Sequence, residues 1–538
     1  AFFEKSRALL LRQKLAGEQA LLTTLSPESR KQEERLRGEE IYQKNLLAEL
    51  EAEEASAAEI EQQRRLIFKA EDARRQFSQQ LAANQPAFAH ALQAYPTVTL
   101  EEVRKRLIRS DTTLLIEYFY NPEQGTLYLA GLTSNALYLS ITALDAGEIG
   151  AFLGLLKNRE INLQMETDHD FRWKFARQAR LLYDALLKPV IPAQLPRELI
   201  IVPDGTLGAI PFDLLLPRDV DDHTDSFQTM PYLLRQTRVH FAASATLLLH
   251  ASPLTEVQQA TIGYLGFCPD YLPGGFFDVV HHGRPCVRRL AELFQGEFLS
   301  GSAATSADFL EQAAHTQILH FYGHAKAEDD RPEQSYLAFS SRTDRDKKAT
   351  AGLIPAKPGK SLGPKSKLPA DVVPDVIFAQ QVSLMHLPAQ LTVLSGCETG
   401  IGLTAGGEGI FSLARAFQEA GCPSTAMTLW TVDDEATAWL TTRFLQYIKN
   451  GAAKDEALRR AKLDFLASSA TPAPYFWSGL VLSGDARPLT GLKTGSYLSL
   501  PDRRLPLIDV LMAVGLMLVI FGLLFAIFRH GSPSNRQI

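Results

Sequence analysis

The feature that most constrains the fold is a series of short, nearly continuous apolar runs between residues 198 and 484. The runs are residues 198–203, 261–267, 316–323, 390–396, 425–432 and 478–484. Segments with helical periodicity separate most of them, including residues 303–314, 408–420 and 435–449. Strands that are apolar throughout are buried on both faces, and their alternation with helices predicts an α/β fold with a mostly parallel sheet flanked by helices. Functional sites in such sheets form outside the carboxyl ends of the strands.

The region before these runs has two parts with different patterns. Residues 1–95 are polar, and Ser26 and Pro27 suit the N-cap and the first turn of a helix. The helical spacing of their apolar residues predicts long amphipathic helices or a helical hairpin, which would bind a regulatory protein partner. The alternative is a solvated charged helix with no partner. Residues 96–178 have strand-like alternation and are expected to link this helical part to the main body.

The main body is expected to cover residues 179–485, with one long interruption. Residues 340–371 are rich in Lys, Gly, Pro and Ser and contain few apolar residues. Such a composition predicts a long mobile basic loop between two strands of the body. A second polar segment, residues 486–504, is expected to be a linker.

The segment Val510–Phe528 contains 19 residues without a charge or a proline. A helix of this length spans roughly 28 Å, about the thickness of the hydrocarbon core of a bilayer. We therefore expect a transmembrane helix over residues 505–530 and a short tail over residues 531–538. A buried core helix is the alternative, but the segment is apolar on every face. Arginines flank it on both sides, so charge alone does not orient it.

The number of cysteines, which is four, and the formal net charge of −6 indicate the cellular compartment and the class of partner. The cysteines are few and have no metal-ligand spacing, which is typical of a reducing compartment. We therefore expect a tail-anchored protein whose body is cytoplasmic. The net charge gives no indication of nucleic-acid binding, and no nucleic-acid partner is predicted.

Cys397 lies where the apolar run 390–396 breaks into glycines, and three interpretations of it compete. The glycines follow a strand and precede a helix, as in phosphate-binding loops, and Asp433 would suit a ribose-binding acid. Their spacing is not G-x-G-x-x-G, and no lysine completes a P-loop. The second interpretation is a buried structural thiol, which we assign to Cys286 and Cys422.

The third interpretation makes Cys397 a nucleophile with His324 as its base. Both residues follow apolar strands, so neighbouring strands would bring the thiol and the imidazole together at one edge of the sheet. An imidazole can take the thiol proton and later protonate the leaving amine. His320 lies inside its strand and is better explained as a satisfied core histidine. Strand residues four apart are separated by about 13 Å, so His320 and His324 cannot share a zinc ion, and no metal is predicted.

The motifs around these residues resemble the CHAT domain, a family in the caspase–gingipain–separase clan of cysteine peptidases. "VLSGCETGIG" with the following "GGEGIFSLARAF", "LIIVPDGTLGAIPFDLLL", "HFYGHA" and "PYFWSGLVLSGD" occur in the family's order. The similarity covers about residues 179–485. It implies a caspase-like fold. The preceding residues resemble the linker that follows tetratricopeptide repeats in such proteins. From this resemblance we expect such repeats upstream of Ala1.

The resemblance implies a role for each site residue. Cys397 would be the nucleophile and His324 the general base. The backbone N–H groups of Cys397 and Ala325 would stabilise the oxyanion. The family usually has glycine where Ala325 stands, and alanine restricts the backbone. Asp434, with its neighbour Asp433, matches a segment that binds a basic side chain before the scissile bond; the alternative is that both acids cap the helix starting at Glu435.

The combined expectation is a membrane-tethered cysteine endopeptidase that uses a Cys–His dyad, a thioester acyl-enzyme and no cofactor. It would cleave protein substrates after a basic residue. The resemblance implies a bacterial source and a role in defence or cell death. A catalytically inactive scaffold at the membrane is the alternative. The basic loop 340–371 is itself a candidate substrate, which predicts regulation by self-cleavage.

Overall fold

The computed structural model describes residues 26–52, 56–85, 98–108, 110–192, 194–220, 225–250, 260–271, 279–326, 335–340, 375–396, 412–431 and 433–492. Its centre is an 11-stranded sheet in the order β3-β2-β1-β4-β5-β14-β13-β12-β8-β6-β7. The strands are β1 (Thr113–Asn121), β2 (Thr126–Leu132), β3 (Leu137–Ala143), β4 (Glu198–Val202), β5 (Arg238–Phe241), β6 (Ile262–Cys268), β7 (Glu297–Ser300), β8 (Thr316–Tyr322), β12 (Leu391–Ser395), β13 (Ser424–Thr428) and β14 (Leu480–Gly484).

The sheet is mostly parallel, as the apolar runs predict. The pairs β1–β4, β4–β5, β5–β14, β12–β13, β8–β12, β6–β8 and β6–β7 are parallel. One antiparallel pair, β13–β14, reverses the strand direction in the middle of the sheet. The hairpin strands β2 and β3 extend it antiparallel to β1. The segment expected as a linker therefore continues the sheet of the main body.

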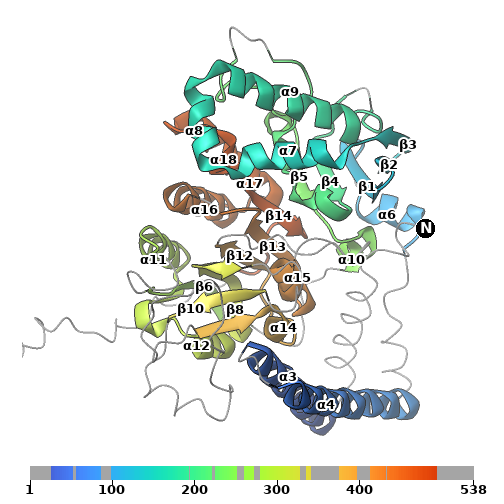
Figure 1. Ribbon diagram of the computed structural model, residues 1–538, viewed down its shortest axis with the longest axis vertical. Helices are drawn as coiled ribbons and strands as arrows, with labels where there is room; N and C mark the ends of the chain where they lie inside the picture. The colour runs from blue at the N-terminus through green and yellow to red at the C-terminus, as the bar shows by residue number, and fades with distance from the viewer. Residues whose placement is uncertain are drawn as a thin grey trace, which may run out of the picture. The chain divides into compact units, whose positions relative to one another are not determined.

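Helices cover both faces of the sheet (Figure 1). The helices α11 (Gly283–Phe294), α16 (Asp434–Lys449) and α17 (Lys454–Ser468) form one row, and α14 (Ala379–Val382) and α15 (Ser412–Glu419) lie on the opposite face. The remaining helices of the body are α6 (Leu100–Arg106), α7 (Ala146–Lys157), α8 (Arg159–Thr167), α9 (His169–Leu186), α10 (Ala245–His250), α12 (Ser306–Gln312) and α18 (Pro474–Trp477). Because helices shield both faces, the central strands β8, β12 and β13 are buried at every residue.

A small antiparallel sheet follows β8 directly. It has the order β11 (Asp375–Phe378), β10 (Tyr336–Phe339) and β9 (Ala325–Lys326). The chain leaves β8 at Tyr322 and enters β9 at Ala325, so Gly323 and His324 form the junction of the two sheets.

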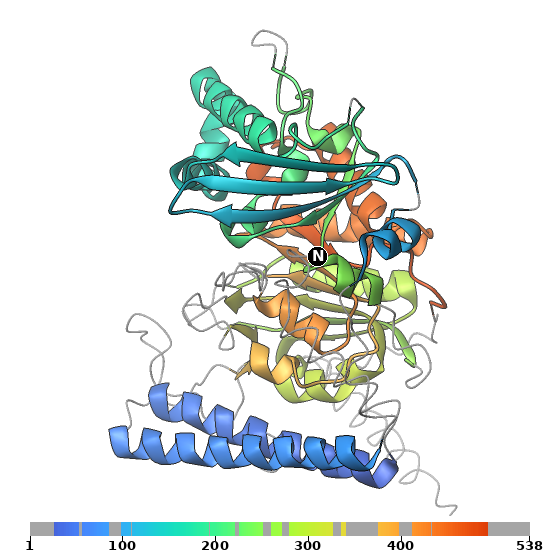
Figure 2. The same cartoon turned by 90° about the vertical axis from the view of Figure 1, so that its right-hand side faces the viewer.

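The N-terminal part contains α3 (Pro27–Ala52) and α4 (Ala57–Asn84), which lie side by side (Figure 2). The Ser26 hydroxyl accepts the Ser29 N–H at 3.2 Å, as expected for an N-cap. Charged side chains join the two helices: Arg74 of α4 pairs with Glu33 at 3.0 Å and with Glu40 at 3.2 Å. The structure thus has two long helices between residues 27 and 84.

The predicted transmembrane segment lies outside the described residues. In the parts of the chain that the structure describes, no helix combines the length and the apolar character needed to cross a bilayer. The span Val510–Phe528 stays a prediction.

Candidate active site

The ends of β8 and β12 lie next to each other at one edge of the main sheet. The two strands are parallel neighbours, and Ser395 is paired with Tyr322 at the end of the ladder. His324 follows Tyr322 by two residues, and Cys397 follows Ser395 by two residues. The two strands are therefore neighbours, which is the condition that the proposed pairing of Cys397 with His324 requires. Cys397 itself belongs to residues 397–411, which lie outside the described part of the chain, so its role stays a prediction.

His324 is half-buried, and both of its backbone groups have partners. Its C=O accepts the Ala338 N–H at 2.9 Å. Its N–H donates to the hydroxyl of Tyr271 at 2.9 Å, and this hydroxyl donates to the Ala338 C=O at 2.7 Å. The Tyr271 ring lies edge-to-face against the His324 imidazole, with 4.7 Å between the ring centroids. Sequence analysis missed Tyr271, because the tyrosine precedes the histidine by 53 residues and belongs to no motif around it.

The backbone of Ala325, predicted to contribute to the oxyanion hole, belongs to the small sheet. It is paired with Leu337 of β10. Hydrogen-bonded and non-hydrogen-bonded pairs alternate along an antiparallel ladder, and the adjacent pair His324–Ala338 is the hydrogen-bonded one. The N–H of Ala325 is therefore directed away from β10. Among the described residues other than glycine, only Gln295 has a positive φ, so the alanine adopts an ordinary backbone conformation.

His320 is a core residue, in agreement with the prediction from its place in the strand. Its Nδ1 lies 2.8 Å from the Tyr264 hydroxyl and its Nε2 lies 3.0 Å from the hydroxyl of Ser395, which in turn lies 3.2 Å from the Thr441 hydroxyl. Complete burial lowers the pKa of His320 to about 3, so the imidazole is neutral. This network connects β6, β8, β12 and α16 beneath the strand end that precedes Cys397.

The other three cysteines are buried thiols. Burial raises the pKa of Cys268 and of Cys422, and it raises the pKa of Cys286 to about 12. A thiol held protonated in this way is a poor nucleophile. The prediction that Cys286 and Cys422 are structural therefore agrees with their surroundings.

The two predicted substrate-binding acids have different partners. Asp433 is the N-cap of α16, since its side chain accepts the Ala436 N–H at 3.1 Å. The carboxylate of Asp434 accepts the backbone N–H groups of His281 at 2.9 Å and His282 at 2.8 Å. It also accepts the Tyr322 hydroxyl at 2.8 Å. Asp433 thus has the capping role that was the alternative to substrate binding, whereas Asp434 joins the start of α11 to the end of β8.

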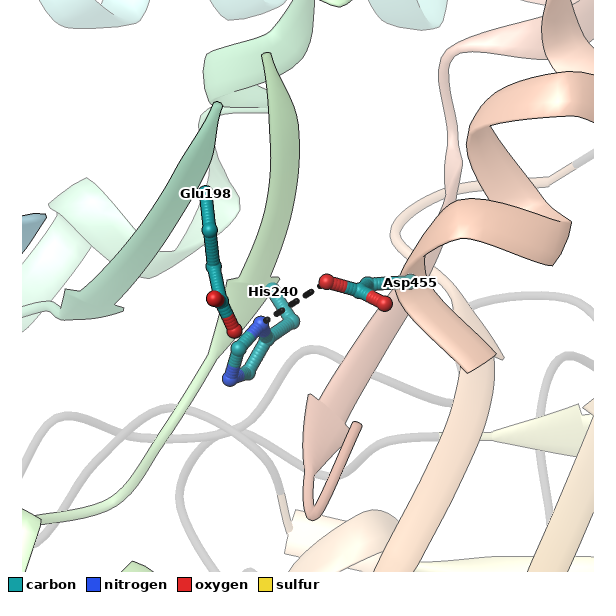
Figure 3. A group of neighbouring side chains, drawn as sticks. All are labelled: Glu198, His240 and Asp455. Carbon is teal, nitrogen blue, oxygen red and sulfur yellow. Dashed lines mark ion pairs between the residues drawn. The ribbon is translucent and has the colours of Figure 1, made fainter. Parts of the chain in front are cut away.

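One further cluster has the composition of a metal site. Glu198, His240 and Asp455 each offer a ligand atom, and these atoms lie within 4.8 Å of one another (Figure 3). Arg238 lies among them, with nitrogens 2.9 Å from Glu198 Oε2 and 2.7 Å from Asp455 Oδ2. A guanidinium already neutralises both carboxylates, so we interpret the cluster as an ion-pair connection between β4, β5 and α17. The sequence prediction of no metal site is not tested by this cluster.

Comparison with known families and proteins gives the following matches. The sequence profile of the CHAT domain matches residues 176–485. Tetratricopeptide repeat protein 28 of Homo sapiens is 24% identical in an alignment of 337 residues that covers 57% of this chain and 13% of that protein. The Mus musculus protein of the same name is 23% identical over 336 residues, with the same coverage. The chain thus spans only about an eighth of the length of these relatives.

Two kinds of solved structure are similar in part. The separase–securin complex of Saccharomyces cerevisiae gives a TM-score of 0.42 at 8% identity, covering 74% of this chain and 32% of that chain. The Arg-specific cysteine proteinase gingipain R gives a TM-score of 0.34 at 8% identity, covering 65% of this chain and 76% of that one.

Proposed function

The chain belongs to the CHAT domain family, and from this premise we propose that it is a cysteine endopeptidase with Cys397 as the nucleophile and His324 as the general base. One observation carries the proposal. The paired ends of β8 and β12 precede His324 and Cys397 by two residues each, so both residues follow adjacent strand ends in the chain. Active sites in α/β sheets form at such carboxyl edges.

The proposed reaction has two stages. The His324 imidazole takes the proton of the Cys397 thiol, and the thiolate attacks the carbonyl carbon of the substrate peptide bond. The tetrahedral intermediate expels the amine, which takes the proton from the imidazolium, and leaves a thioester. A water molecule, deprotonated by the imidazole, then hydrolyses the thioester to a carboxylic acid and restores the thiol.

The N–H of Ala325 is proposed to stabilise the oxyanion of both tetrahedral intermediates. Its direction away from β10 supports this role, because the ladder leaves it unused by Leu337. The backbone N–H of Cys397 is the second proposed donor. Preorganised donors of this kind typically contribute a factor of about 100 to 1000 in rate.

Selection of a basic residue is proposed to depend on Asp434. Its carboxylate accepts the hydroxyl of Tyr322 at 2.8 Å, and Tyr322 is the last residue of β8, two residues before His324. The Asp434 side chain is about a third exposed, which supports its proposed access to a cationic side chain of the substrate. Asp433 is proposed to contribute only charge, since its side chain caps α16.

The test is labelling by an electrophile that carries an Arg or Lys side chain. We expect labelling of the wild type, none in Cys397→Ser and slower labelling in His324→Ala. Cys286→Ser is the matched control, because that thiol is buried and its pKa is raised to about 12, so labelling should persist. Absence of labelling in the wild type, with or without added partner proteins, would support the non-catalytic scaffold instead.

The wider setting of the activity is proposed from the sequence alone. We propose that the segment Val510–Phe528 tethers a cytoplasmic catalytic body to a membrane and that a protein partner regulates it through the N-terminal helices. A bacterial source and a role in defence or cell death are predictions from the family resemblance. Self-cleavage within the basic loop, of which residues 341–371 are outside the described part, should give fragments in intact-mass spectra of the wild type and none in Cys397→Ala.

A further inference from the structure

We propose that Tyr271 is a positioning residue that holds His324, and the N–H of Ala325 after it, in the geometry for catalysis. This inference rests on the proposed function of the site. Tyr271 follows β6, whereas His324 follows β8 and Ala338 belongs to β10. Its hydroxyl therefore connects three segments that are far apart in the sequence, at the place where the main sheet passes into the small one.

The hydroxyl replaces one hydrogen bond of a β-ladder. In a hydrogen-bonded antiparallel pair, each residue donates its N–H to the C=O of the other. Ala338 donates to the His324 C=O directly at 2.9 Å. The reciprocal bond is not direct: the His324 N–H donates to the Tyr271 hydroxyl at 2.9 Å, and the hydroxyl donates to the Ala338 C=O at 2.7 Å. The strands are therefore opened on this side by one inserted oxygen atom.

The space for this insertion is provided by Gly323. A Cβ atom at this position would lie 2.4 Å from the Tyr271 hydroxyl oxygen, which is closer than non-bonded atoms approach. Any side chain at residue 323 would displace either the hydroxyl or the backbone that carries His324. Glycine and the tyrosine hydroxyl thus form one arrangement, and a change at either residue disturbs the same bridge.

Tyr271 also contacts the imidazole itself. The two rings meet edge-to-face at 74°, with centroids 4.7 Å apart, which is a favourable geometry for aromatic pairs. Tyr271 is buried, so the residues packed around it restrict the movement of the ring that contacts the imidazole. The same residue therefore restricts the backbone of His324 through its hydroxyl and the side chain through its ring.

Two groups of the site depend on this restraint. The imidazole must point toward the end of β12, and the plane of the peptide bond between His324 and Ala325 determines where the Ala325 N–H points. Loss of the hydroxyl leaves the His324 N–H without this acceptor and removes the link to the Ala338 C=O. Misplacement of a reacting group by about 1 Å costs on the order of 100-fold in rate.

The experiment compares Tyr271→Phe and Gly323→Ala with a matched control, Tyr118→Phe. Tyr118 is also buried, and its hydroxyl donates to the Leu186 C=O at 2.8 Å, away from the site. Measurements on the full chain are the pH dependence of labelling by the basic electrophile, kcat and KM on a basic peptide, and NMR spectra of ¹³C-labelled histidine, with the His324 signal assigned from His324→Gln.

We expect kcat to fall by roughly 10- to 100-fold in Tyr271→Phe and Gly323→Ala, with little change in KM. The labelling midpoint should move to higher pH, because an imidazolium farther from the sulfur stabilises the thiolate less. The double variant should be no worse than the more impaired single variant, since both changes remove one bridge. Tyr118→Phe should leave the rate, the midpoint and the His324 signal unchanged, which separates positioning from a general loss of stability.

The outcomes distinguish this inference from the proposed function. Wild-type labelling with the same kcat, pH midpoint and His324 signal in Tyr271→Phe would overturn the positioning role and leave the peptidase intact. A wild type that is never labelled would overturn the peptidase, and the NMR signal then decides alone: a His324 shift in Tyr271→Phe, but not in Tyr118→Phe, supports positioning, and no shift overturns it.

Discussion

Of the two histidines in the "HFYGHA" segment, we expect His320 to contribute to stability and His324 to catalysis. The variant His320→Gln tests the first expectation most directly. His320 is completely buried between the hydroxyls of Tyr264 and Ser395. Glutamine keeps a donor and an acceptor in this space but cannot titrate. We therefore expect the variant to be less stable at neutral pH, because its amide fits the two hydroxyls less well, but to have a weaker dependence of stability on pH.

The size of the pH effect follows from the pKa of His320, which burial lowers from 6.5 to about 3. The unfolded chain binds a proton on this residue below pH 6.5, whereas the folded chain does so only near pH 3. The contribution of the neutral His320 to the free energy of unfolding is therefore fully present above pH 6.5, and it is lost as the pH falls from 6.5 toward 3. At pH 5 the loss is about 2 kcal/mol, from 1.36 kcal/mol per pH unit over the 1.5 units below 6.5.

The assay is urea denaturation of the wild type and the variant at pH 7.5 and pH 5. The difference in unfolding free energy between them should change by about 2 kcal/mol in favour of the variant at the lower pH. His324→Gln is the control: it retains His320, so the wild-type loss from that residue should persist, while labelling of Cys397 should fall. The same pH dependence in the wild type and His320→Gln would refute the buried neutral histidine.

Three further predictions concern charged groups. Lys462→Met should lower the free energy of unfolding, measured by urea denaturation, by about 3–5 kcal/mol. The reason is that the buried Asp213 carboxylate, 2.6 Å from the Lys462 ammonium, loses its cation. Adding Asp213→Leu to this variant should restore much of the lost stability. Asp434→Asn should retain the fold, since its amide oxygen still accepts the N–H groups of His281 and His282. It should lower kcat/KM for an Arg peptide at least 10-fold relative to kcat/KM for a norleucine peptide. An equal effect on both peptides would contradict a role in substrate binding. Arg238→Gln should destabilise the fold by about 3 kcal/mol, because Asp455 is buried, and a variant as stable as the wild type would contradict the ion-pair interpretation.

The strands of the central sheet were predictable because each continuous apolar run indicates by itself a strand that is buried on both faces. Every predicted run overlaps a strand, from β4 in residues 198–203 to β14 in residues 478–484. Two short strands, β5 and β7, have four residues each and were not predicted, because runs this short have no clear periodicity. The position of His324 after its strand was predictable for the same reason.

What the sequence could not show is how segments far apart pair with one another. The reversal of direction between β13 and β14 follows from packing of the whole sheet, and no local pattern marks it. The partners of Asp434 are also non-local: its carboxylate contacts His281 and His282, more than 150 residues earlier in the chain. The sequence therefore left capping and substrate binding as equal alternatives for this acid.

The amino-acid sequence by itself determined the α/β class, the family and the positions of Cys397 and His324 after apolar strands, because burial of a strand and the end of a run are local properties. Only the tertiary structure decided that these strands are neighbours and that Tyr271 occupies a bond of the ladder at His324. It also decided that Arg238 neutralises Glu198 and Asp455. The physical reason is the same in each case. A hydrogen bond or an ion pair depends on the distance between two atoms that the fold brings together, and this distance cannot be inferred from how far apart the residues are in the sequence.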